Sequence, residues 1–152
     1  MSIELLDIET ITDLTTQLFC SLFGDEALLP APGALSALAE TAIVASVDIA
    51  GDNPASVEVA CSLPFAHEVA ASMFALPEDE LDERSVHDAV GELVNIIGGN
   101  VKSLLEGATT LTLPFLRAEA LGAADGPACA AGFAWRGQPL AVRITERAPV
   151  SA

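Results

Sequence analysis

The fold is decided by the stretch Asp88-Ala-Val-Gly-Glu92-Leu-Val-Asn95-Ile-Ile-Gly-Gly99-Asn100. Its apolar residues recur with a helical period, and we predict one long helix from about Ser85 to Glu106. At about 100° per residue, one side of this helix is the face expected on the core: Val86, Val90, Leu93, Ile97, Val101 and Leu104. The other side carries a polar stripe within roughly 40° of one line: Asp88, Glu92, Asn95, Gly99, Lys102 and Glu106.

The polar stripe contains residues that a merely solvated helix surface does not need. Asn95 is a poor helix former and follows one turn after Glu92. Three interior glycines (Gly91, Gly98 and Gly99) lie nearby, and each costs about 1 kcal/mol of helix stability relative to alanine. Either a partner approaches this helix closely, or the glycines let the helix pack on its own domain; the sequence leaves both interpretations open.

The rest of the chain predicts short helices and hairpins. The expected elements are a helix at about 9–23 ending at Gly24, a strand hairpin at 41–50 and 56–63, a helix from Pro64 to Leu76, a strand through Leu111, Leu113 and Phe115, a turn at 122–127, and a second hairpin at 128–135 and 140–145. The order is therefore α-β-β-α-α-β-β-β. Because hairpins join most strands, we predict an α+β fold with a mostly antiparallel sheet and helices packed on it, in one domain over residues 1–152.

Composition limits the possible partners. The formal net charge of −16 argues against nucleic acid and against an anionic membrane surface, and it favours a partner with positive charge. No apolar stretch approaches the roughly 18 residues that span a bilayer, and no secretory signal is evident, so we expect a cytoplasmic protein. Three widely spaced cysteines predict neither a disulfide framework nor a zinc site, and we expect mostly buried thiols.

The spacing of the stripe resembles the CheC/CheX family of chemotaxis phosphatases. An acidic residue is followed by Glu four positions later, Asn three later and then Gly-Asn; the matching residues are Asp88, Glu92, Asn95, Gly99 and Asn100. The first helix contains no Glu-x-x-Asn, which favours the single-motif CheX branch. Pro114 follows Asn95 sooner than the proline of the CheC pattern, a difference that we assign to the branch. The element order is similar over roughly the whole chain.

The resemblance implies a phosphatase that acts on the phosphoaspartate of a response-regulator receiver domain. Asn95 is expected to orient a water for in-line attack, and Glu92 to engage the active-site lysine of the receiver through a charge-assisted hydrogen bond. The Mg²⁺ is expected on the receiver, so this chain needs no cofactor and no metal site of its own. The competing hypotheses are a CheX-like adaptor that binds a receiver without turnover, and a structural partner domain with a decayed site.

The other stripe residues are given lesser parts. Asp88, Gly99 and Lys102 are expected to contact the partner, whereas Gly98 and Asn100 are expected to support the helix from within the protein. The resemblance also implies a homodimer joined partly through a sheet edge. The last hairpin is apolar, with Arg143 and Arg147 the only positive side chains on its final strand, so that edge is lightly guarded against pairing.

Two further features have ordinary explanations. The run Glu78-Asp-Glu-Leu-Asp-Glu83 holds five carboxylates in six residues. It is either a solvent-exposed acidic segment that complements the positive end of the following helix, or a docking surface for a basic partner. His67 and His87 are too far apart in sequence to suggest a metal pair, and we expect partly exposed helix residues.

Overall fold

The computed structural model describes residues 7–24, 28–39, 42–105, 107, 109–117, 121–122 and 128–147. The helices are α1 (Ile8–Phe23), α2 (Gly33–Leu38), α3 (Leu63–Phe74), the 3₁₀ turn η2 (Glu78–Glu80) and α4 (Glu83–Leu104). The strands are β1 (Leu29–Pro30), β2 (Ile43–Gly51), β3 (Ala55–Cys61), β4 (Thr109–Leu111), β5 (Phe115–Arg117), β6 (Ala128–Trp135) and β7 (Gln138–Glu146).

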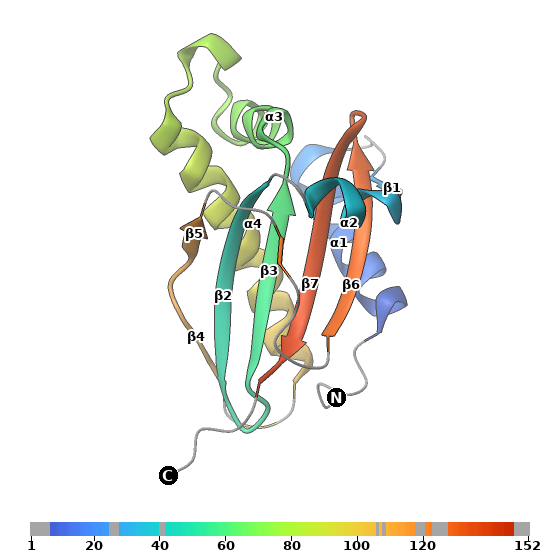
Figure 1. Ribbon diagram of the computed structural model, residues 1–152. Coiled ribbons are helices and arrows are strands. Elements are labelled where there is room, and N and C mark those ends of the chain that lie inside the picture. The colour runs from blue at the N-terminus through green and yellow to red at the C-terminus, as the bar shows by residue number, and fades with distance from the viewer. Residues whose placement is uncertain are drawn as a thin grey trace.

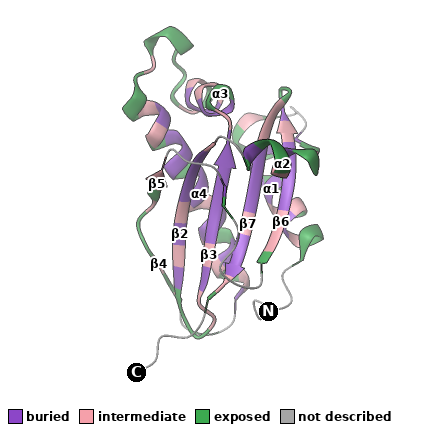
Figure 2. Ribbon diagram, in the orientation of Figure 1, coloured by how far each residue is buried: buried purple, intermediate pink, exposed green. Residues whose placement is uncertain are grey.

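The seven described strands form one sheet in the order β1-β6-β7-β3-β2-β4, and β5 also pairs with β2. Every described pair is antiparallel. Figure 1 shows α1 and α4 behind the sheet, α2 in front of it, and α3 across one end. The main core fills the space between the sheet and the helices behind it (Figure 2). The predicted α+β fold with its antiparallel sheet is confirmed.

The first residues of the helices explain where they begin. The side chain of Asp7 accepts a hydrogen bond from the Thr10 amide at 2.8 Å, and that of Asp82 accepts one from the Ser85 amide at 2.7 Å. The Ser85 hydroxyl also donates to Asp82, at 2.7 Å, and contributes most to the shift there. These bonds stabilise the ionised carboxylates, so the pKa of each aspartate lies below its ordinary value of 3.8. Ser62 caps α3 in the same way. Each cap satisfies an amide that has no partner inside its own helix.

The predicted third strand is wrong in one respect, because it is split in two. β4 pairs with the far end of β2 and β5 with its beginning. Between them lie Leu113, which is 89% exposed, and Pro114. Proline has no amide hydrogen to donate to the neighbouring strand, which explains the break. The connection between α1 and β2 also contains α2 and β1, and Leu63 starts α3 instead of ending a strand.

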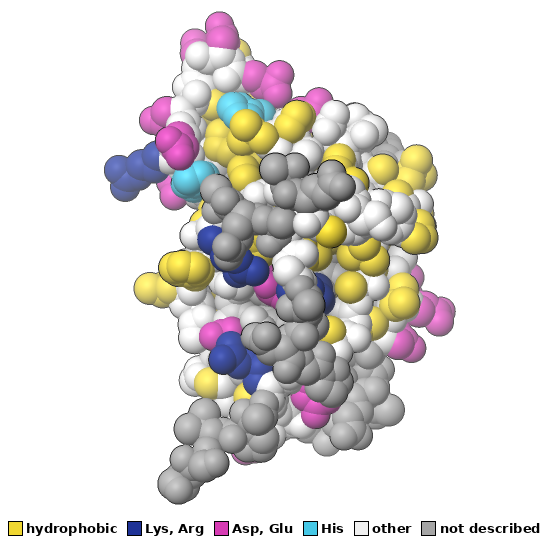
Figure 3. Space-filling view, in the orientation of Figure 1, with side chains coloured by type: hydrophobic (Ala, Val, Ile, Leu, Met, Phe, Trp, Pro, Cys, Tyr) yellow, Lys and Arg dark blue, Asp and Glu magenta, His cyan; other side chains and the backbone are white. Residues whose placement is uncertain are grey.

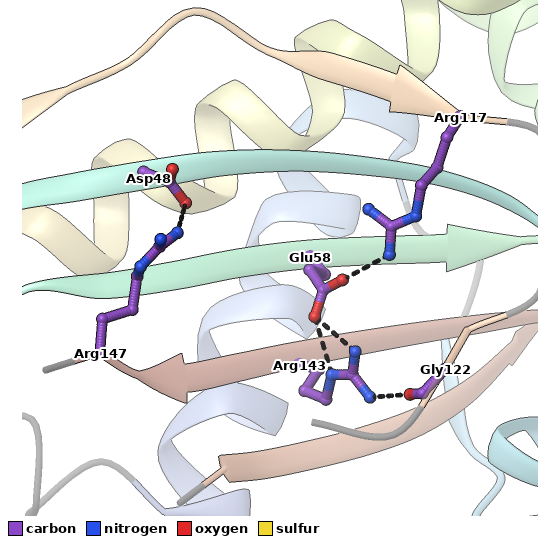
Figure 4. Close-up of polar contacts among 6 residues, drawn as sticks. All are labelled: Asp48, Glu58, Arg117, Gly122, Arg143 and Arg147. Atoms are coloured by element: carbon purple, nitrogen blue, oxygen red, sulfur yellow. Dashed lines mark hydrogen bonds and ion pairs between the residues drawn. The ribbon is translucent and has the colours of Figure 1, made fainter. Parts of the chain in front are cut away.

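The final strand is not an edge of the sheet, so the prediction that placed the lightly guarded edge there is wrong. β7 lies between β6 and β3. Basic side chains gather in the middle of the face that α2 only partly covers (Figure 3). Arg143 contacts Glu58 at 2.6 Å, and Arg117 reaches across β2 to the same carboxylate at 2.9 Å; Arg147 contacts Asp48 at 2.8 Å (Figure 4). Arg143 and Arg147 therefore form ion pairs with strands β3 and β2 inside the sheet and do not lie on its edge.

Two other expectations meet the structure only in part. Cys61 is buried and Cys129 is half-buried, as expected, but Cys20 is exposed. Of the expected turn at 122–127, only residue 122 lies within the described residues.

Candidate functional site on helix α4

Helix α4 is the predicted long helix, shifted by two residues toward the N-terminus at both ends. Its core side packs against β2 and β3, and the predicted apolar residues are buried except Leu104, which is half-buried. Glu106 lies outside the described residues. The period of the sequence therefore identified both the helix and the side that faces the sheet.

The polar stripe lies on the side of α4 away from the core. Asp88 and Glu92 are exposed, and Asn95, Gly99 and Lys102 are half-buried. Glu92 and Asn95 are three residues apart, a spacing that puts their side chains within about 5–6 Å at Cβ on one helix surface. Among the described residues, neither the carboxylate of Glu92 nor the carboxamide of Asn95 has a hydrogen-bond or ion-pair partner. Both groups are available to a second molecule.

The three glycines of α4 have different surroundings. A Cβ at Gly98 would lie 2.5 Å from Cγ2 of Val47 on β2, so close packing on the sheet requires this glycine. A Cβ at Gly91 would lie 3.4 Å from Cδ1 of Leu116, which is ordinary contact. A Cβ at Gly99 would meet nothing within 4 Å. Packing inside the chain therefore explains Gly98 but gives no reason for Gly99.

Asn95 stands between two glycines along the helix surface. Gly91 lies four residues before it and Gly99 four residues after it, and residues four apart are neighbours on a helix. Neither of these two positions therefore has a side chain that could cover the carboxamide. Pro114 and Leu116 of the β5 segment lie against Gly91. The sequence did not predict that this segment lies beside α4.

Asn100 lies on the opposite flank of α4. It is exposed and lines a groove of about 480 Å³ between α1 and α4. Its backbone carbonyl accepts a hydrogen bond from the Ser103 hydroxyl at 2.8 Å. Its side chain has no hydrogen-bond partner among the described residues, so the expected bonding of this side chain within the protein is not seen there.

Signs of other chemistry are few in the part of the chain that the structure describes. No group of three or more His, Cys, Asp or Glu side chains there is arranged to hold a metal ion. Burial raises the pKa of the Cys61 thiol to about 12, which keeps it protonated and a poor nucleophile. The helices within the described ranges include none with the length and hydropathy that crossing a membrane demands.

Comparison with known proteins places this geometry in a family. No curated protein matches the sequence significantly. A chain of the CheX–CheY–BeF₃–Mg²⁺ complex from Borrelia burgdorferi superposes with a TM-score of 0.71 at 20% identity, over 93% of this chain and 97% of that one. A CheC-like superfamily protein from Shewanella sp. PV-4 gives 0.74 at 18% identity, over 97% and 100%.

CheX from Vibrio vulnificus gives a TM-score of 0.71 at 14% identity, over 92% of this chain and 95% of that one. At these identities the likenesses show the fold. The sequence profile of the family described as "Chemotaxis phosphatase CheX" matches residues 43–133, which include the whole of α4. Because this match covers more than half of the chain, the protein belongs to the CheX family of chemotaxis phosphatases.

Proposed function

We propose that this protein hydrolyses the phosphoaspartate of a CheY-like receiver domain, with α4 as the surface that enters the receiver's active site. The observation that carries the proposal is the pair formed by exposed Glu92 and half-buried Asn95 on the side of α4 away from the core. Neither side chain has a polar partner among the described residues, and Asn95 is flanked by glycines on both adjacent turns. Membership of the CheX family supports it. So does the solved Borrelia complex, in which CheX and CheY occur together with a fluoroberyllate and Mg²⁺.

Asn95 is proposed to position the attacking water. A carboxamide can accept a hydrogen bond from a water with its oxygen and donate one with its nitrogen, so one side chain can fix the orientation of the nucleophile. The water oxygen forms a bond to phosphorus while the bond between phosphorus and the aspartyl oxygen breaks, which releases inorganic phosphate and the free carboxylate. Phosphoryl transfer depends mainly on positioning and electrostatics, which a single amide can supply.

Glu92 is proposed to fix the register of the complex. Its exposed carboxylate lies one turn before Asn95, where it can form a charge-assisted hydrogen bond with the lysine of the receiver's active site. Mg²⁺ is proposed to belong to the receiver.

The test of docking is a titration of activated receiver against two variants. Glu92→Ala should weaken binding and lower the rate, and Glu92→Lys should weaken binding further, because it places like charges together. Equal affinity for the two variants would remove Glu92 from the interface.

Turnover itself is tested by the decay of phosphorylated receivers from the source organism with and without the wild-type protein. Faster decay of at least one receiver is expected. The adaptor alternative predicts receiver binding with an unchanged decay rate, and that result would overturn the proposed phosphatase.

We also propose a homodimer, which rests on the resemblance to the CheX branch. The β4–β5 side of the sheet is our candidate for the interface, because Leu113 is 89% exposed and Phe115 is 64% exposed there. Neighbouring exposed apolar side chains are typical of a surface that binds another chain.

A further inference from the structure

A second hollow lies where α3 and α4 meet the beginning of β2. Its volume is about 660 Å³, within the range of about 300–1,000 Å³ usual for ligand pockets. The apolar lining comes from three separate parts of the chain: Ile43, Leu63, Pro64, Leu81 and Val86. We call this hollow the α3–α4 pocket. Its lining is suited to apolar side chains or another apolar group.

The rim of the α3–α4 pocket is strongly acidic. Asp82 and Glu83 line it, together with His67 and His87. The carboxylates of η2 are all exposed and lie immediately before Leu81 in the chain. In Figure 3, acidic side chains crowd the end of the molecule above α3 and the start of α4, next to hydrophobic and histidine side chains. A group that enters this pocket passes two carboxylates on the rim and lies near the three of η2, which favours a basic segment.

The α3–α4 pocket adjoins the proposed phosphatase surface. His87 on its rim lies four residues before Gly91 and eight before Asn95, so the three residues lie on the same flank of α4. From His87 to Asn95 the helix rises by about 12 Å. A standard protein–protein interface covers about 800 Å² per partner and is on the order of 30 Å across. An interface of this size centred on Glu92 and Asn95 can therefore extend as far as the pocket.

We propose that the α3–α4 pocket receives an apolar side chain from a basic segment of the receiver domain that α4 dephosphorylates. This inference rests on the proposed function and extends it, because it assigns part of the receiver affinity and selectivity to residues outside the catalytic pair. Apolar contact supplies binding energy, and the acidic rim favours receivers with lysine or arginine beside the inserted side chain. It also gives the acidic run a function beyond solvation.

The deciding experiment compares Leu63→Arg with Ile8→Arg. Both residues are the first of a helix and follow a capping side chain, and they are 55% and 58% exposed respectively. The probe is the receiver domain of the source organism that the wild-type protein binds most tightly, activated with beryllium fluoride and Mg²⁺. Leu63→Arg puts bulk and positive charge at the pocket, and we expect its Kd to rise at least tenfold. The kcat at saturating phosphorylated receiver should stay within twofold of wild type, because the catalytic pair is untouched. Ile8→Arg should change neither value.

A second variant tests the negative charge beside the pocket without altering the pocket's lining. Asp79→Asn combined with Glu80→Gln removes two exposed charges of η2, and we expect weaker receiver binding with a smaller dependence on salt concentration.

If Leu63→Arg and the double variant both bind the receiver as wild type does, the pocket proposal is overturned while the phosphatase stands. A pocket that serves a small molecule or a second copy of this chain gives that same result. If wild-type protein binds receivers without accelerating their dephosphorylation, the phosphatase fails, whereas a loss of affinity in Leu63→Arg would still support docking. If no receiver binds, both proposals fail.

Discussion

Adjacent glycines on α4 should respond in opposite ways to alanine, because only one of them is explained by packing inside the chain. Gly99→Ala adds a methyl group to open space. The helix should therefore gain about 1 kcal/mol in free energy of unfolding from the better propensity of alanine. For a chain of this length that gain corresponds to a rise in Tm of about 2–4 °C.

Gly98→Ala should destabilise the protein instead. Its Cβ would lie 2.5 Å from Cγ2 of Val47 and 3.3 Å from Cδ1 of Leu111. Val47 is buried and β-branched, so its methyl group cannot swing away freely. Overpacking of this kind costs about 1–3 kcal/mol, which meets or exceeds the gain in helix propensity.

Gly99→Ala should raise the stability of the protein but weaken its binding to the receiver. If a partner packs closely on this surface, the added methyl group costs about 1–3 kcal/mol of affinity, and each 1.4 kcal/mol is about a tenfold rise in Kd. The assay is chemical denaturation together with titration of activated receiver for both variants. A Gly99→Ala protein that is more stable and binds as tightly as wild type would refute the close approach, and one that is less stable would refute the open surroundings.

Three further predictions concern the scaffold and the assembly. Glu58→Ala should lower the free energy of unfolding by about 3–5 kcal/mol, because it removes the buried carboxylate that Arg117 and Arg143 share. Arg147→Ala should cost less than about 1 kcal/mol, because its ion pair with Asp48 is half exposed. Equal losses in denaturation curves would contradict this ranking. The pKa of Asp82 is lowered, so its cap is fully effective above pH 3.8 and is lost as the pH falls through the lower pKa of the folded state. The difference in stability between wild type and Asp82→Ala should therefore shrink below about pH 4, and a difference that stays constant down to pH 2 would count against the cap. Light scattering at moderate salt should give about twice the chain mass of 15.6 kDa, and Phe115→Lys should shift the protein toward monomer; a monomeric wild type at every salt concentration would exclude the dimer.

Local patterns in the sequence predicted the elements with strong periods. The period of α4 identified its buried side, and the strand alternation at Val57 and Val59 gave the β2–β3 hairpin. These signals are local, because the spacing of apolar residues within a short window is enough to show which face of a helix or strand is buried.

Non-local features could not be predicted in the same way. Nothing along the chain shows that the final strand lies between β6 and β3, because strand order depends on which segments meet after folding. The α3–α4 pocket likewise combines residues 42–43, 62–67 and 81–87. Pro114 lies at the break between β4 and β5. The alternation of Leu111, Leu113 and Phe115 nevertheless predicted one continuous strand.

The sequence identified the polar stripe but could not show why α4 has glycine at positions 98 and 99. Gly98 and Gly99 are adjacent and identical in type, and only the positions of Val47 and Leu111 distinguish them. The roles of Glu92 and Asn95 are predictions that rest on the CheX resemblance and on the lack of a polar partner for either side chain among the described residues.

The most direct test of the central claim is single-turnover dephosphorylation of the phosphorylated receiver by Asn95→Ala, with its binding to activated receiver measured in parallel. An amide that aligns the attacking water acts mainly in the transition state, so its loss lowers the rate more than the affinity. We predict a rate at least about 10²-fold lower, with a Kd within about threefold of wild type and an unchanged Tm. Dephosphorylation by Asn95→Ala at the wild-type rate would contradict the account.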